Sequence, residues 1–214
     1  MAENTNKINI CNRALMLLGV TNFVTSLARG TVEASVFAYV YDTALKSMLQ
    51  SFPWSFATKH YTLTDISAKG EVPQAFTYAY ELPDDCLAVR RVYSKSAAAL
   101  SFCPNAPFPF TMGLLYETTE AVNVEAIFCN LASALCEGTY YLEDISAMSP
   151  LFLDALVWRI ALEMSVPLSG GNFSNRQNLT QYYADALRSA RTHDANENLG
   201  IKPIWGDEYL MMRK

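Results

Sequence analysis

The short segment from Ser51 to Ala57 constrains the fold more than any other part of the chain. Its sequence is SFPWSFA, so three aromatic rings and a proline lie within seven residues. Apolar residues before it recur at the spacing of a helix, whereas those after it alternate as in β-strands. We therefore expect the segment to end a helix near Gln50 and to fix it against a β-rich region that begins near Tyr61.

Two amphipathic helices are predicted before this segment. The first covers about residues 7–18, ends at Gly19, and has its buried face at Ile8, Cys11, Leu15 and Leu18. The second follows a turn at Arg29-Gly30, and Thr31 is suited to cap it. Its apolar stripe consists of Phe37, Val40, Ala44 and Met48. We expect the two helices to pack together as a hairpin.

The region from about residue 61 to residue 141 is predicted to form strands, because its apolar residues alternate. The strand candidates are residues 61–66, 76–80, 87–93, 114–117 and 122–128. Residues 126–136 fit a strand or a helix. The segment Ser101–Met112 contains three prolines, which exclude a central strand, and is expected to be a stiff loop with exposed rings or an irregular edge.

Two further helices are predicted in the last third of the chain. The third begins at Ser149-Pro150, with a hydroxyl cap and a proline at the first helical position, and Pro167 ends it. It is apolar on almost every face, which is typical of a central helix. The fourth begins with the capping box Ser174-x-x-Gln177 and continues to about Asn196.

These elements predict an α+β fold with a four-helix bundle-like body and an inserted antiparallel β-rich region. The body consists of residues 1–58 and 146–197, and the insertion consists of residues 59–145. Residues 198–214 contain two glycines and a proline around Trp205. We expect them to form an irregular C-terminal docking tail.

The composition favours a protein whose surface is largely covered by other protein. Charged residues make up only 17% of the chain and apolar residues 51%, whereas globular domains usually carry about 25% charged residues. The net charge of −5 argues against a site that binds nucleic acid by neutralising phosphates. The five cysteines fit no metal framework and indicate a reducing compartment, and no segment is suited to cross a membrane.

We predict no catalytic residue, metal site or cofactor. His60 and His193 have no partners in sequence that would suggest a site. The adjacent carboxylates Asp84-Asp85 and Glu143-Asp144 are ordinary turn residues. The alternative is that these carboxylates are the acid and base of a glycan hydrolase.

The candidate partner-binding residues lie in three places. Exposed rings on a stiff loop require a covering partner, and this loop carries Phe102, Phe108 and Phe110. Arg188 and Arg191 share a face of the fourth helix, where they either pair with Asp185 and Glu197 or contact an acidic partner. The tail contributes Ile204, Trp205 and Tyr209.

Several motifs, taken in order, resemble a known family. The first is Ile8-x-x-Cys11-Asn12-Arg13-Ala14-Leu15-x-x-Leu18-Gly19, followed by the segment around Trp54. Next come Phe76-x-Tyr78-x-Tyr80-x-Leu82-Pro83 and Val89-Arg90-Arg91-Val92. The last two helices contribute Pro150-Leu151-Phe152 and Tyr183-x-x-Ala186-Leu187-x-x-Ala190-Arg191. Together, over roughly residues 7–197, they resemble podovirus tail tubular protein A, the head-to-tail adaptor of short-tailed phages.

This resemblance implies a structural virion protein of the viral neck and tail, assembled in the cytoplasm of the bacterial host. Its partners would be the portal protein, the tail nozzle or other tail proteins, and further copies of itself in a ring, commonly of twelve subunits. DNA would pass through the channel during ejection without specific binding, and an acidic wall favours such sliding. A glycan hydrolase and a cellular helical scaffold protein remain the alternatives.

Overall fold

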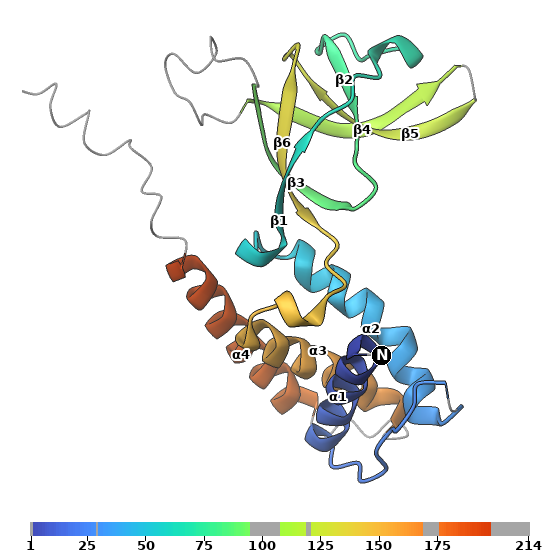
Figure 1. The fold of residues 1–214 in the computed structure, drawn as a ribbon, viewed down its shortest axis with the longest axis vertical. Coiled ribbons are helices and arrows are strands. Elements are labelled where there is room, and N and C mark those ends of the chain that lie inside the picture. The colour runs from blue at the N-terminus through green and yellow to red at the C-terminus, as the bar shows by residue number, and fades with distance from the viewer. Residues whose placement is uncertain (1, 29, 95–107, 119–120, 169–175, 198–214) are drawn as a thin grey trace, which may run out of the picture. The chain divides into compact units, whose positions relative to one another are not determined.

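The computed structural model describes residues 2–28, 30–94, 108–118, 121–168 and 176–197. Within these residues the chain forms four α-helices and six β-strands, as Figure 1 shows. The helices are α1 (Ala2–Leu17), α2 (Val32–Gln50), α3 (Pro150–Leu168) and α4 (Arg176–Glu197). The strands are β1 (Thr58–Thr62), β2 (Tyr78–Glu81), β3 (Cys86–Ser94), β4 (Phe110–Glu117), β5 (Val122–Cys129) and β6 (Ala134–Tyr140).

The chain divides into two compact units. The helical unit consists of Met1–Leu45 and Asp144–Lys214, and the β unit consists of Lys46–Glu143. The first boundary therefore lies inside α2, whereas the sequence placed it after residue 58. The second lies after Glu143, where the sequence placed it after residue 145.

The predicted four-helix bundle-like body is wrong, although the α+β class holds. In the described residues α3 packs closely against α1 and α4, and α1 is not paired with α2 as a hairpin. Figure 1 shows α3 and α4 side by side. The reason lies in α2, whose buried stripe continues through Met48 and Leu49 into the β unit. The last turns of α2 therefore belong to the β unit and not to the helical unit.

The helix starts follow from their capping residues. The Thr31 hydroxyl oxygen accepts a hydrogen bond from the Ala34 backbone N–H (3.2 Å), so the predicted cap of α2 is confirmed. The Ser149 hydroxyl oxygen accepts one from the Phe152 N–H (3.3 Å) at the start of α3. Pro167 lies inside the last turn of α3. The predicted cap Ser174 lies outside the described residues.

The β unit contains two three-stranded antiparallel sheets, with strand orders β1-β6-β3 and β2-β5-β4. Hydrogen bonds join the sheets along two edges. Beyond β1, the Ile66 N–H donates to the Ala79 carbonyl oxygen (2.8 Å), and the Phe108 N–H donates to the Val92 carbonyl oxygen (2.9 Å). The result is a barrel-like arrangement in which the chain after β1 leaves one sheet and pairs with the other.

Several predicted strand limits change because of this arrangement. The expected strand at residues 61–66 is β1 followed by the crossing segment, and β1 begins earlier, at Thr58. The strand β4 begins at Phe110 and not at residue 114, so the end of the proline-rich segment Ser101–Met112 belongs to a strand. The ambiguous residues 126–136 contain the end of β5 and the start of β6 and no helix.

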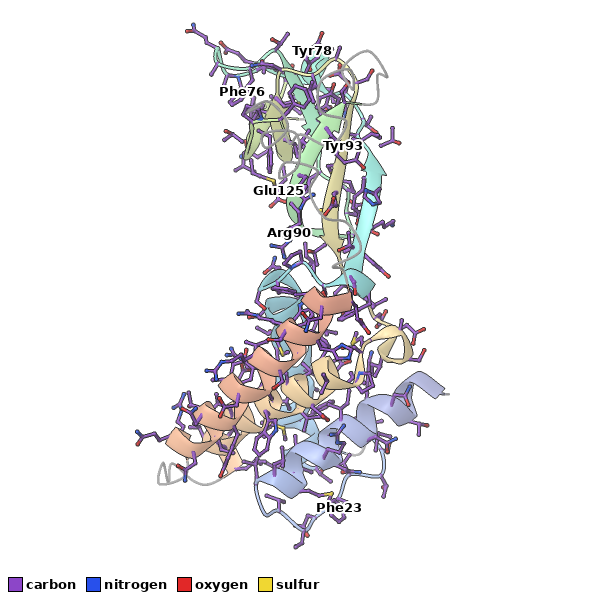
Figure 2. The ribbon with its side chains drawn as sticks, turned by 90° about the vertical axis from the view of Figure 1, so that its left-hand side faces the viewer. Phe23, Phe76, Tyr78, Arg90, Tyr93 and Glu125 are labelled. Carbon is purple, nitrogen blue, oxygen red and sulfur yellow. The ribbon has the colours of Figure 1, made fainter. Side chains whose placement is uncertain are left out.

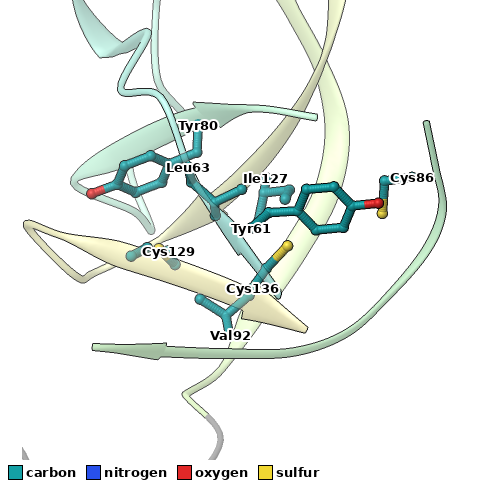
Figure 3. Close-up of a cluster of buried hydrophobic side chains, with 9 residues drawn as sticks. Tyr61, Leu63, Tyr80, Cys86, Val92, Ile127, Cys129 and Cys136 are labelled. Atoms are coloured by element: carbon teal, nitrogen blue, oxygen red, sulfur yellow. The ribbon is translucent and has the colours of Figure 1, made fainter. Parts of the chain in front are cut away.

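Two apolar clusters hold the β unit together. The larger lies between the sheets and is drawn in Figure 3; it consists of Tyr61, Leu63, Tyr80, Cys86, Val92, Ile127, Cys129, Ala134 and Cys136. The smaller lies on the other face of β5 and consists of Ile66, Ala79, Leu115, Ala126 and Phe128. The last four residues of β5 are all buried because their side chains alternate between the two clusters.

The aromatic segment anchors the end of α2 within the β unit. Trp54 has no exposed surface, and its indole N–H donates to the Met48 carbonyl oxygen (2.9 Å). The Arg90 guanidinium, labelled in Figure 2, donates from Nη2 to the carbonyl oxygens of Gln50 (2.7 Å) and Phe52 (3.1 Å). A cation is favourable at the C-terminus of a helix, where carbonyl groups lack partners within the helix.

Candidate docking surfaces

An open groove with a mainly apolar lining lies in the helical unit. It has a volume of about 420 Å³ and lies between α1, α3 and α4. Its lining residues are Arg13, Met16, Leu17, Leu151, Asp154, Val157, Trp158, Ala186 and Ser189. Met16 is 62% exposed. The groove therefore offers apolar side chains to solvent over three neighbouring helices.

The groove follows from the sequence of α3. This helix is apolar almost all round, so it requires covering on every face. In the described residues α1 and α4 pack on α3, and Trp158 remains half-buried in the groove. The Trp158 ring contacts the exposed Tyr182 ring, with 5.0 Å between centroids. The Arg13 guanidinium and the Asp154 carboxylate form an ion pair (2.5 Å) that adds a polar group to the apolar lining.

A second exposed apolar surface lies on the hairpin of β4 and β5. Met112, Leu114 and Tyr116 occupy alternate positions of β4 and are all exposed. Their cross-strand partners in β5 are Ile127, Glu125 and Asn123, respectively. Ile127 belongs to the core between the sheets, so this apolar row continues the buried face into solvent. We call these three side chains the β4 row.

The edge of the hairpin near the β4 row is fixed by an ion pair between a buried carboxylate and an exposed lysine. The Glu117 carboxylate is almost fully buried, and its Oε2 lies 3.5 Å from the Lys69 Nζ. The Thr118 N–H donates to the Lys69 carbonyl oxygen (3.0 Å), and Gly70 forms a bridge with Glu117. A side chain at residue 70 would meet the Tyr116 carbonyl oxygen at 2.3 Å, so only glycine fits this close approach. These contacts hold the end of β4 in place.

The predicted aromatic residues are only partly described. Phe108 is exposed and joins β4 to β3 through its backbone, whereas Phe110 is half-buried against the core between the sheets. Phe110 is therefore mainly a core residue. The other four predicted aromatic or apolar residues, Phe102, Ile204, Trp205 and Tyr209, lie outside the described residues.

The two predicted arginines lie beside a second hollow on α4. The hollow has a volume of about 360 Å³ and is lined by Tyr183, Ala184, Leu187, Arg188, Arg191 and Thr192. Arg188 is exposed and pairs with the Asp185 carboxylate (3.3 Å), as the solvated alternative expected. Arg191 is half-buried. The Glu197 Oε1 lies 3.6 Å from the His193 Nδ1, so Glu197 contacts His193.

Two of the paired carboxylates, Asp85 and Asp144, lie in settings that stabilise their ionised forms. The Lys59 ammonium donates to the Asp85 carboxylate (2.6 Å), and this hydrogen bond lowers the pKa of Asp85 despite an opposing effect of burial. Hydrogen bonds from the Ser146 hydroxyl and backbone N–H lower the pKa of Asp144. A glycosidase acid requires the opposite shift, because it must be protonated near neutral pH.

The described histidine and cysteine side chains lie in structural settings that do not indicate a reactive site. The His60 Nδ1 lies 2.8 Å from the Tyr93 hydroxyl oxygen. Burial raises the pKa of the Cys11 thiol to about 11 and that of Cys136 to about 12, so both remain protonated and weakly nucleophilic. Among the described residues, no three histidine, cysteine or carboxylate side chains are grouped so as to hold a metal ion.

Sequence reasoning missed most of the exposed apolar residues described here. The β4 row has a clear signal, since Phe110, Met112, Leu114 and Tyr116 alternate, but the nearby prolines led us to start the strand too late. Met16 lies outside the buried stripe predicted for α1, and this position is the signal that could have marked it as an exposed apolar residue. Phe23, in the segment after α1, is also exposed and is labelled in Figure 2.

Comparisons with known proteins leave the family open. No protein-family model matches the chain, and a search of curated proteins found no match. In the part of the chain that the structure describes, no helix combines the length and apolar character needed to cross a membrane.

Proposed function

We propose that this protein is a head-to-tail adaptor of a short-tailed phage. It forms a ring, commonly of twelve subunits, between the portal vertex and the tail nozzle or other tail proteins, and DNA passes through the ring. The observation that carries the proposal is that each unit has its own exposed apolar surface. These are the groove in the helical unit and the β4 row in the β unit.

Separate apolar surfaces suit a subunit that contacts more than one neighbour. Monomeric soluble proteins rarely expose large contiguous apolar patches, and such patches mark protein interfaces or other binding sites. A charged-residue content of 17% points in the same direction, because interface cores are depleted in charge. The sequence motifs that resemble tail tubular protein A specify which kind of assembly we propose.

The glycan hydrolase is the less favoured alternative. Its acid would have to be one of the paired carboxylates, and the pKa values of Asp85 and Asp144 are both lowered. Each of these two carboxylates already accepts hydrogen bonds from a neighbouring side chain. No observation on the described residues specifically favours hydrolysis.

The proposal is tested by measuring native mass with and without the portal protein encoded in the same genome. We expect a small species when the purified chain is alone and a complex containing about twelve copies when the portal is added. A chain that ignores the portal and remains small would refute the proposal. A zymogram on host cell wall, with Asp85→Asn as control, would then test the hydrolase.

A deletion tests the predicted docking role of the C-terminal tail. The contacts described in both units involve residues up to Glu197, so a chain lacking residues 198–214 should keep its fold. We expect the deleted chain to retain its circular dichroism spectrum but to lose portal binding. Unchanged affinity for the portal would show that the tail is not the docking segment.

A further inference from the structure

We propose that the groove between α1, α3 and α4 binds the C-terminal tail, residues 198–214, of the same chain. Ile204 and Trp205 are the apolar residues that enter it. This inference concerns the free chain and holds whether or not the protein is an adaptor.

The groove has the properties of a binding site for a few apolar side chains. Its volume of about 420 Å³ lies within the range of about 300–1,000 Å³ that is typical of ligand pockets. The lining is mainly apolar, with Met16 and Leu17 exposed from α1 and Trp158 half-buried from α3. The Arg13–Asp154 ion pair adds polar groups that a peptide backbone can contact.

The tail begins close enough to reach this groove. The helix α4 lines the groove through Ala186 and Ser189 and ends at Glu197, where the tail begins. Eight residues of helix separate Ser189 from Glu197, a distance of about 12 Å at about 1.5 Å per residue. Four extended residues span about 13 Å, so the tail can return to the level of Ser189 before Ile204 is reached.

The composition of the tail matches an apolar groove. Eight of its seventeen residues are large and apolar, namely Leu199, Ile201, Ile204, Trp205, Tyr209, Leu210, Met211 and Met212. Gly200 and Pro203 disfavour a continuation of α4, so the chain can change direction directly after the helix. Such a sequence gains by covering apolar surface, and of the two hollows that α4 lines, the groove is the larger and has more apolar side chains in its lining.

Binding within one chain is favoured over binding between chains at ordinary concentrations. A short connection gives an attached segment an effective concentration of the order of millimolar. A neighbouring copy in dilute solution cannot compete with this. The tail of the same chain is therefore the occupant that we infer, and the tail of a second copy is the main alternative.

The test places a photo-cross-linking amino acid, p-benzoylphenylalanine, at position 16 of the full-length chain. Unlabelled and ¹⁵N-labelled chains are mixed before illumination, and cross-linked peptides are identified by mass spectrometry. We expect position 16 to cross-link to residues 198–214 of a chain with the same isotope label. The matched control has the cross-linker at position 39, because Tyr39 is 86% exposed on α2 and does not line the groove.

Each outcome decides the proposal. Same-label cross-links from position 16, absent from position 39 and reduced about tenfold by Trp205→Ala, support it. Cross-links that join labelled to unlabelled chains would overturn it in favour of exchange between copies, and a lack of cross-links to the tail would overturn it outright. If the position-16 variant does not fold, position 182 serves instead, because Tyr182 is exposed and contacts Trp158.

Discussion

In the β unit the second half of the central strand β5 is covered on both faces, whereas in the helical unit the most apolar helix, α3, still borders an open groove. The side chains of β5 alternate between two apolar clusters, and the two sheets are joined along two edges. The helix α3 is covered closely by α1 and α4, and Trp158 remains half-buried.

This difference shows that apolar side chains can stabilise the fold in one unit and remain available for binding in the other. In the β unit most apolar side chains stabilise the fold, so substitutions there should lower the free energy of unfolding. Along the groove, apolar side chains remain exposed, so substitutions there should affect binding more than stability. The predictions below test this distinction, beginning with the largest effect.

The largest effect is expected for Trp54→Ala, which removes the buried ring that anchors α2 in the β unit. The ring contacts Phe52 and Phe56, with centroid distances of 5.0 and 5.8 Å, and its N–H bonds to the Met48 carbonyl oxygen. We expect a loss of about 3–5 kcal/mol in the free energy of unfolding, measured in urea.

Hydrogen exchange on the same variant tests whether the two units are independent. If their cores are separate, amides of β5 and β6 should exchange faster in Trp54→Ala, and amides of α3 should keep their protection. Equal acceleration in α3 and β5 would show that the units unfold together. The difference between the covered core of the β unit and the open groove of the helical unit would then have no counterpart in their stabilities.

The next effect is expected for Arg90→Met. It removes donors to the carbonyl oxygens of Gln50 and Phe52 and to the Thr139 hydroxyl oxygen (2.9 Å). Because hydrogen bonds from a charged group are worth about 1.5–3 kcal/mol, we expect a loss of about 2–3 kcal/mol in urea unfolding. Arg91→Met is the matched control, since Arg91 is exposed, and should change stability by less than about 0.5 kcal/mol. Equal losses in both variants would contradict the anchoring role of Arg90.

Arg90 also illustrates the limit of what the sequence could predict. The aromatic segment after Gln50 marks the end of a helix and the start of a β region, and both are present. The caps Thr31 and Ser149 were found because capping depends on residues a few positions apart. The partnership of Arg90 with Gln50 joins residues forty positions apart, and no local pattern encodes it.

The same limit explains the errors in the fold and in the candidate surfaces. The stripe of α2 predicts which of its side chains are buried but not that Met48 and Leu49 belong to a different unit from Phe37. Helical spacing likewise predicts that α3 is central without predicting which neighbours cover it. The groove depends on which helices pack on α3, so it could not be found before the structure.

A smaller effect is expected for Asp85→Asn, and it should be present at neutral pH and lost in acid. The Lys59 ammonium lowers the pKa of Asp85 in the folded state, so the ion pair adds stability above the unfolded-state value of about 4 and loses it as the pH falls through the folded-state value. Both side chains are about half exposed, so this contribution should be below about 1 kcal/mol. Urea unfolding at pH 7 and below pH 4 should show a wild-type advantage only at pH 7. Asp84→Asn is the control, and an equal change in that variant would contradict the assignment.

The smallest effect on stability is expected for Leu114→Ser, which sharpens the comparison inside a single strand. Leu114 is 63% exposed in the β4 row, whereas the adjacent Leu115 is buried in the smaller cluster. We expect Leu114→Ser to change the free energy of unfolding by less than about 0.5 kcal/mol, and Leu115→Ala to lower it by about 2–5 kcal/mol. Native mass measured with the portal should show fewer bound copies of Leu114→Ser than of the wild type, although this variant is fully folded. Normal assembly by that variant would show that the β4 row is not a docking surface. Of the two proposed surfaces, only the groove would then keep a binding role.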